Sequence, residues 1–377
     1  MKNKYTKILV LLFTLILISA VISASMPQKA IDTSSKIEKR LISPGVSNFD
    51  KISYRLKGCE ITHELNDAIA LKCPKGVQIQ GAFEDEVYQI MDIDANVQIN
   101  ADDVWNLGFT GAGVTVAVLD TGIDTDNPEL INSLVDGKGF GYATYEDDNG
   151  HGTHVSGIIT ADGINTKAKG VAPDAKVWMA KVCNSQGSCY VSDIAAAIEY
   201  VVKGTDGIAN NGDEPAKIMS ISLGGGGTAG SNCDRDYLAS KVNWAVDNGI
   251  TVVVAAGNSA GKVSSPACAS KAIAVGAVDK SDVRASWSGT GLALDIMAPG
   301  VSIYSTTLLG YASWSGTSMA TPHISAVVSL LRQKNPTWTD TQIKNALYKT
   351  AKDLGKTGWD KQYGWGRVDA LKAINYV

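Results

Sequence analysis

The sequence lacks several patterns that would place the chain in a specialised class of protein. The net charge is −4, so the basic excess typical of nucleic-acid-binding proteins is missing and we expect no nucleic-acid partner. The 38 glycines follow no G-X-Y period, which excludes a collagen-like triple helix. After the first 25 residues, no stretch is long and apolar enough to span a bilayer. The charged fraction of 19% and the hydrophobic fraction of 45% exclude disorder of the whole chain and allow a large core.

Residues 1–25 have the pattern of a secretory signal peptide. Three lysines precede the apolar stretch 8–18, and small residues follow it. The alternative is an uncleaved membrane anchor, for which the 17 residues 8–24 are at the short limit. We expect cleavage within residues 23–26, a secreted extracellular product and no membrane attachment after cleavage. Export would also favour disulfides among the six cysteines.

Residues 26–90 are predicted to form a small separate unit. Residues 26–50 are polar and are interpreted as a loose linker, whereas 51–57, 68–73 and 76–81 alternate apolar and polar residues, as half-buried strands do. A unit of this size is only marginally stable alone. A disulfide between its two cysteines, Cys59 and Cys73, could stabilise it.

Residues 91–377 alternate strand-like and helical patterns. The predicted strands are apolar on both faces and cover 114–119, 176–182, 218–223, 250–255 and 272–278. Apolar residues between and after them recur at helical spacing. This alternation predicts a doubly wound α/β fold, with a mostly parallel sheet and helices on both faces. In such sheets the functional site lies beyond the carboxyl ends of the strands.

Chemically useful residues stand at these strand ends and at helix starts. Asp120 and Asn258 follow predicted strands, and His151 and Ser318 open predicted helices. An acid, a base, a hydroxyl and an amide are the parts of a catalyst that uses a hydroxyl nucleophile. Each residue alone could be an ordinary turn or cap residue. His151 and His154 could also bind a metal, but no His-Glu-x-x-His pattern accompanies them.

The combined motifs resemble those of the subtilisin-like serine proteases, over residues 99–377. The motifs are Asp-Thr-Gly at 120–122, His-Gly-Thr-His at 151–154, Ser-Leu-Gly-Gly at 222–225, Ala-Ala-Gly-Asn at 255–258 and Gly-Thr-Ser-Met-Ala at 316–320. The order Asp, His, Ser is that of the family, whereas a lipase or esterase of the α/β-hydrolase type needs the order Ser, Asp, His. The resemblance implies a secreted serine endopeptidase. A peptide-binding pseudo-enzyme and a membrane-anchored structural protein are the alternatives.

The resemblance also implies a role for each site residue. Ser318 would be the nucleophile, His151 the general base, Asp120 the residue that orients His151, and Asn258 an oxyanion donor. Pro322 would lie in the first turn of the helix that begins near Ser318. The predicted substrate-binding residues are Asn149, Ser222, Leu223, Gly224, Ala256 and Gly257. The small residues among them, with no acidic residue in either wall segment, predict a preference for a large apolar or aromatic residue before the cut.

By position, residues 26–90 resemble the inhibitory propeptides of this family, with a final strand at 77–83. The chain would then be a self-processing proenzyme and its propeptide an intramolecular inhibitor, and we expect the mature enzyme to be a monomer acting on polypeptides. A released propeptide should not be tethered to the enzyme, which favours a disulfide between Cys59 and Cys73. Cys183 and Cys189 flank a short loop that a disulfide could close, which leaves Cys233 to pair with Cys268.

Family members need no cofactor for the chemistry, but structural calcium is possible. The carboxylate of Glu129 matches a position that binds calcium in the family. The loop 161–169 has a fitting length, but Ile164 stands where a side-chain ligand is usual, with Asn165 beside it. The alternative is a loop without a metal.

Overall fold

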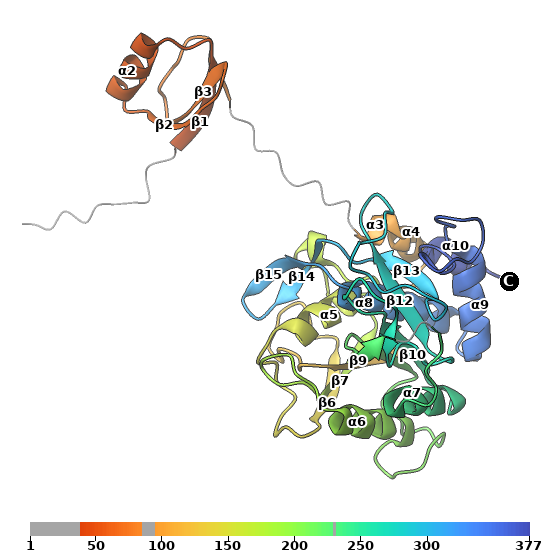
Figure 1. The fold of residues 1–377 in the computed structure, drawn as a ribbon. Helices are drawn as coiled ribbons and strands as arrows, with labels where there is room; N and C mark the ends of the chain where they lie inside the picture. The colour runs from red at the N-terminus through yellow and green to blue at the C-terminus, as the bar shows by residue number, and fades with distance from the viewer. Residues whose placement is uncertain (1–37, 85–94, 229–230) are drawn as a thin grey trace, which may run out of the picture. The chain divides into compact units, whose positions relative to one another are not determined.

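The computed structural model describes residues 38–84 and 95–377, apart from 229–230 (Figure 1). The predicted signal peptide lies outside the described residues. The chain divides into two compact units, residues 1–90 and 91–377, and each is described by itself below.

The smaller unit is an antiparallel sheet with one helix. Its elements are β1 Glu38–Pro44, α2 Asn48–Leu56, β2 Glu60–Glu64, β3 Ala68–Pro74 and β4 Phe83–Glu84. The strand order is β2-β3-β1-β4. Tyr54 of α2 packs against Leu41, Ile69 and Leu71 of the sheet in a small buried core. The disulfide Cys59–Cys73 joins the start of β2 to β3 and extends this core.

Four sequence predictions for this unit are wrong. Residues 51–57 belong largely to helix α2, because Ser47 and Asp50 form a capping box that opens a helix in place of a strand. The predicted linker 26–50 contains β1. The predicted strand over 76–81 and the predicted final strand over 77–83 are mostly irregular chain, and only the short β4 pairs with β1, through residues 83 and 84.

The larger unit is built on a seven-stranded sheet in the order β13-β12-β10-β8-β5-β7-β6. All of its strand pairs are parallel. The strands are β5 Thr115–Asp120, β6 Leu134–Gly139, β7 Lys176–Lys181, β8 Ile218–Ile221, β10 Thr251–Ala255, β12 Ile273–Val278 and β13 Ile296–Pro299. This confirms the predicted doubly wound α/β class, and five of the seven strands lie where the apolar patterns predicted them.

Two layers of helices cover the sheet (Figure 1). The described helices, with one 3-10 turn among the described residues, are α3 Ala95–Gln98, α4 Ala101–Asn106, α5 His151–Thr160, η1 Thr166–Ala168, α6 Val191–Lys203, α7 Tyr237–Asp247, α8 Thr317–Lys334, α9 Asp340–Thr350 and α10 Ala370–Ile374. Val116 and Val118 of β5 face the core that contains α5 and α8. Ala117 and Leu119 face the core that contains α6 and α7. The alternation of side chains along each strand thus buries both faces.

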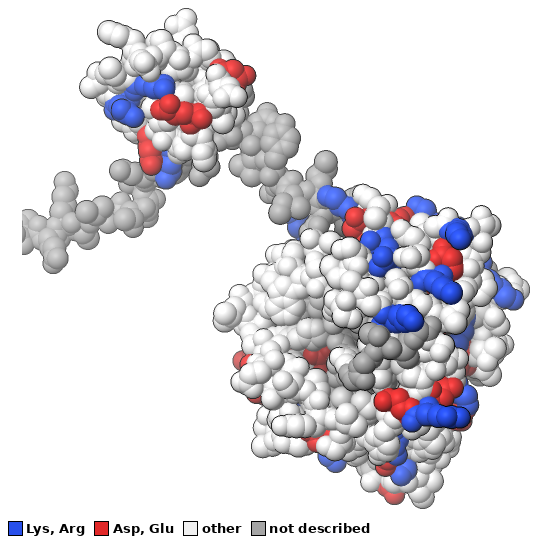
Figure 2. All heavy atoms as spheres, in the orientation of Figure 1, with Lys and Arg blue, Asp and Glu red and all other residues white. Residues whose placement is uncertain are grey.

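Two small antiparallel pairs flank the sheet. β9 Gly225–Thr228 pairs with β11 Ser264–Ser265, and β14 Ile303–Thr307 pairs with β15 Gly310–Trp314. On the face in Figure 2, positive and negative side chains of the larger unit lie among one another. None of the helices within residues 38–84 and 95–377 is long and apolar enough to cross a membrane.

Candidate active site

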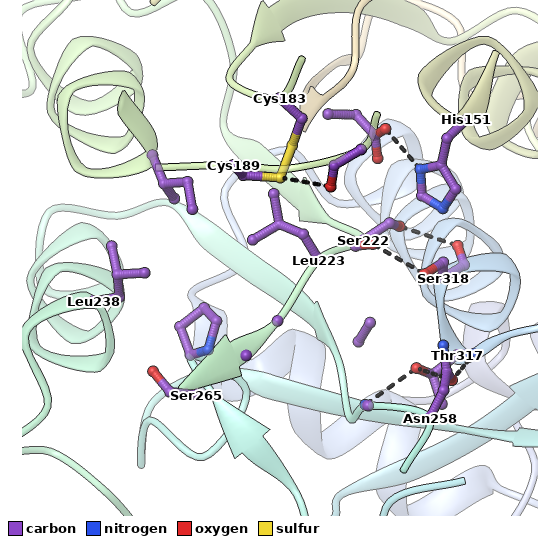
Figure 3. Close-up of a pocket in the computed structure, with 18 of the residues that line it drawn as sticks. His151, Cys183, Cys189, Ser222, Leu223, Leu238, Asn258, Ser265, Thr317 and Ser318 are labelled. Atoms are coloured by element: carbon purple, nitrogen blue, oxygen red, sulfur yellow. Dashed lines mark hydrogen bonds and ion pairs between the residues drawn. A yellow bond between two sulfur atoms is a disulfide. The ribbon is translucent and has the colours of Figure 1, made fainter. Parts of the chain in front are cut away.

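A cleft of about 790 Å³ opens at the carboxyl ends of β5, β8 and β10 (Figure 3). Asp120 is the last residue of β5. His151 is the first residue of α5, and Ser318 is the second residue of α8. All three line the cleft together with Asn258. The parallel topology therefore brings together residues that are up to 198 positions apart in the sequence.

Asp120 and His151 form a direct pair. The distance from His151 Nδ1 to Asp120 Oδ1 is 2.7 Å, and the same oxygen accepts the Thr121 N–H. Gly152 allows this approach, because a Cβ there would lie 2.1 Å from the Gly122 carbonyl oxygen. Since the ring donates through Nδ1 to the carboxylate, Nε2 is the nitrogen left to accept a proton.

A second carboxylate, Asp147, supports the turn that carries His151, and the sequence analysis did not identify it. Its Oδ1 accepts hydrogen bonds from Thr121 Oγ1, Asn149 N and Gly150 N. Its Oδ2 accepts from the backbone N–H and the hydroxyl of Thr153. Burial lowers the pKa of His151, but the charge and hydrogen bond of Asp120, with a further contribution from Asp147, raise it to a net value above the usual range. The surroundings of His151 therefore stabilise the charged form of its imidazole.

The hydroxyl of Ser318 donates to the carbonyl oxygen of Ser222 at 3.0 Å. The Ser222 hydroxyl donates in turn to the Ser318 carbonyl oxygen, also at 3.0 Å. The predicted place of Pro322 is wrong: α8 begins at Thr317, so Pro322 is its sixth residue. Because Pro322 has no N–H, it cannot bond the carbonyl four residues earlier, which is that of Ser318. Ser222 supplies the missing donor and ties the start of α8 to the end of β8.

Asn258 is fixed through its side-chain oxygen. Its Oδ1 accepts from the Thr317 N–H at 2.8 Å and from the Thr317 hydroxyl at 2.9 Å. The amide Nδ2 is consequently the end of the side chain that is available to a ligand. It lies beside the start of α8, 3.4 Å from the position that a Cβ on Gly316 would occupy. The positive end of the α8 dipole points to the same place.

Five of the six predicted substrate-binding residues line the cleft, and one does not. Those that line it are Asn149, Ser222, Leu223, Gly224 and Gly257. Ala256 is fully buried in the core on the α6–α7 side, because successive residues at the end of β10 point in opposite directions; Ala255, the last residue of β10, lines the cleft instead. Ser264, which the sequence analysis did not select, lies between the two glycines: its Oγ is 3.0 Å from a Cβ built on Gly224 and 2.8 Å from one built on Gly257.

The far end of the cleft is apolar. Val191 and Ile194 of α6 and Leu238 of α7 line it together with Leu223 (Figure 3). Only the fold brings these two helices to the cleft, so their contribution could not be predicted from the sequence. Asp236 also reaches the cleft, but its carboxylate caps α7 by accepting from Ala239 N.

The disulfide Cys183–Cys189 lies at the edge of the cleft. It closes a turn in which Asn184 Oδ1 accepts from the N–H groups of Gln186 and Ser188. The Asn149 amide donates to the Ser185 carbonyl at 3.0 Å, so this loop also contacts the turn before His151. The third disulfide is Cys233–Cys268, and all three pairs are those that the sequence predicted.

The metal hypotheses do not fit the side chains. His154 stacks on Trp314 with ring centroids 4.4 Å apart, and its Nε2 bonds the Ala312 carbonyl oxygen. Burial lowers the pKa of His154 to about 4, so this ring is a neutral core residue. Glu129 is fully buried, and its carboxylate accepts four hydrogen bonds from protein donors, which is not the environment of a calcium ligand. Within the described ranges, no group of three or more His, Cys, Asp or Glu could hold a metal.

Comparison with known proteins agrees with this arrangement. A family model described as "Subtilase family" (Peptidase_S8) matches residues 111–366. M-protease of Shouchella clausii is 40% identical over 331 residues, 83% of this chain and 81% of the relative. Subtilisin Savinase of Lederbergia lenta is 43% identical over 280 residues, 73% of this chain and 96% of the relative. Alkaline elastase YaB of a Bacillus species is 36% identical over 387 aligned positions, 96% of this chain and 97% of the relative.

The fold and the cleft are thus those of a hydrolase that uses a serine hydroxyl. The chain belongs to the subtilase family of serine endopeptidases.

Proposed function

We propose that this enzyme cleaves polypeptides through Asp120, His151 and Ser318, with Asn258 as an oxyanion donor. The observation that carries the assignment is the 2.7 Å pair of His151 with Asp120 in the cleft that also contains Ser318. In the reactive state the Ser318 hydroxyl leaves the Ser222 carbonyl and turns toward His151, because hydrogen bonds of a catalytic base often form only when substrate is bound.

The proposed reaction then runs through an acyl-enzyme. Ser318 Oγ attacks the scissile carbonyl carbon while its proton passes to His151 Nε2. Asn258 Nδ2 and the Ser318 backbone N–H stabilise the oxyanion. His151 donates the proton to the leaving amine, and a water molecule, deprotonated by His151, hydrolyses the ester. No cofactor takes part.

Labelling with a serine-directed phosphonyl reagent tests the assignment. We expect loss of peptide hydrolysis in step with the covalent modification of Ser318, found by peptide mapping. Modification of a different residue, or hydrolysis that continues in fully labelled protein, would contradict the proposed nucleophile.

The first substrate pocket is proposed to lie between Gly224 and Gly257, with Ser264 at its end. Because the residues that form its walls are small, the pocket has room for a large side chain, which supports a preference for large apolar or aromatic residues before the cut. Ser264→Gly removes the hydroxyl that lies against both walls, so we expect kcat/KM for Phe relative to Ala at this position to rise about tenfold. Ser264→Val should lower the same ratio.

Ser265→Ala is the matched control, because the Ser265 hydroxyl bonds Asp236 and not the two glycines. Its Phe/Ala ratio should equal that of the wild type. An unchanged ratio in Ser264→Gly, or a peptide library dominated by Lys or Arg before the cut, would show that the pocket lies elsewhere.

The domain organisation is proposed to be a signal peptide at 1–25, a propeptide at 26–90 and a catalytic unit at 91–377. Under this proposal the chain is secreted as a self-processing proenzyme, is inhibited by its own propeptide until released, and acts as a monomer. The relatives support a separable N-terminal part. Subtilisin Savinase is covered over 96% of its length by 73% of this chain, whereas alkaline elastase YaB matches 96% of this chain. We propose no residue of this chain as a ligand of structural calcium.

A further inference from the structure

We propose that hydrogen bonds to the buried carboxylate of Glu129 hold the loop 161–169 in place, and that the loop needs no calcium ion. The loop follows α5 directly, and Glu129 comes from the segment between β5 and β6. The Glu129 carbonyl oxygen accepts the Asp162 N–H at 3.0 Å, so its backbone also fixes the loop.

The carboxylate contacts consecutive backbone donors. Oε2 accepts the N–H groups of Gly163 at 2.7 Å and Ile164 at 3.0 Å, and Oε1 accepts that of Asn165 at 2.7 Å. Gly163 has a φ of +80°, which lets the three N–H groups converge on one side. Converging backbone N–H groups form a site for an anion. A cation in this position would face the positive ends of three peptide dipoles.

A fourth hydrogen bond fills the remaining acceptor site of the Glu129 carboxylate. The Tyr311 hydroxyl donates to Oε1 at 2.8 Å. Burial, together with this bond, raises the pKa of Tyr311 to about 12, so the hydroxyl keeps its proton at all ordinary pH values. A carboxylate has about four lone-pair sites, and four donors use them. Glu129 therefore has no lone pair left for a metal.

This anchor also connects two parts of the active-site framework. Tyr311 belongs to β15, the strand that precedes α8 and Ser318. The Asn165 amide donates to Tyr304 of β14 at 3.3 Å, so the loop contacts both strands of the hairpin. The loop after the His151 helix is thus joined to the hairpin before the Ser318 helix through protein groups alone.

Hydrogen exchange of the full-length Ser318→Ala chain, in calcium and in EDTA, tests this proposal. The peptide covering residues 161–167 should be equally protected in both solutions. Glu129→Gln loses the charge and two of the acceptor lone pairs, so exchange of this peptide should be about 10- to 100-fold faster in both solutions. Asp162→Asn is the matched control: it neutralises the carboxylate of the loop itself and should leave the exchange within about twofold of the parent.

Protection that is lost in EDTA and restored by calcium would overturn the proposal, and this result needs no variant. Unchanged protection in Glu129→Gln would overturn it as well. Because the readout does not involve catalysis, neither outcome depends on the role assigned to Ser318.

Discussion

Ser318→Ala should abolish peptide hydrolysis and leave the N-terminal part of the chain attached. The rate should fall by about 10⁶-fold, the order known for a subtilisin that loses its nucleophile. If processing is self-catalysed, the variant should accumulate as a proform that begins near residues 23–26, whereas the wild type should begin between residues 88 and 99. N-terminal sequencing and activity assays of both proteins measure the two effects.

Two controls separate loss of chemistry from loss of fold. Ser313→Ala removes an exposed serine from β15, a few residues before the nucleophile, and should be processed like the wild type. Added wild-type enzyme should convert the Ser318→Ala proform to the mature length. If the Ser318→Ala protein alone acquires the wild-type N-terminus, another protease makes the cut.

Asp120→Asn should lower kcat/KM by about 10⁴-fold and shift its pH dependence. A decrease in rate of this order is found for serine proteases that lose the corresponding carboxylate. Only neutral His151 accepts the Ser318 proton, so wild-type activity should rise as the pH increases through the raised pKa of His151. Asparagine removes the largest contribution that raises this pKa. The rise should therefore move to lower pH in the variant, in a pH profile of kcat/KM.

Asp148→Asn is the control for a general change of charge near the site. This carboxylate is 54% exposed and pairs with Lys181 at 2.6 Å, and it does not bond His151. Its rate should stay within a few-fold of the wild type, because such an exposed charge is screened by solvent. A pH profile of Asp120→Asn that coincides with the wild-type profile would exclude Asp120 as the source of the shift.

The sequence predicted the centre of the larger unit well and its edges less well. Strands buried on both faces, such as β5 and β10, are continuous apolar runs that stand out in the sequence. The edge strand β6 contains Asp136, Gly137 and Lys138, and the opposite edge strand β13 has only four residues, so neither has such a run. In the smaller unit, the capping box of Ser47 and Asp50 opens a helix where an alternating pattern suggested a strand.

The residues of the proposed triad could be identified because their motifs are specific, whereas their supports could not. Asp147 is one acidic residue in a polar loop, and its importance comes from five donors that only the fold brings to it. Glu129 was predicted as a calcium ligand, but its partners are mainly backbone N–H groups, which have no residue-specific signal. Ala256 was misplaced because the direction of a side chain after a strand depends on where the strand ends.

The parallel sheet also affects how fast the enzyme can form. β5 pairs with β8, about one hundred residues later, so even the central pairing closes a long loop of chain. Sheets made of such distant pairs fold slowly, because chain entropy is lost before the contacts that repay it are made. Asp120 and Ser318 come to line one cleft only when the strands and helices that carry them have packed together. Residues 38–84 are synthesised first, and their paired strands lie closer together in the chain than β5 and β8 do, so this unit can fold before the topology of the larger unit is complete.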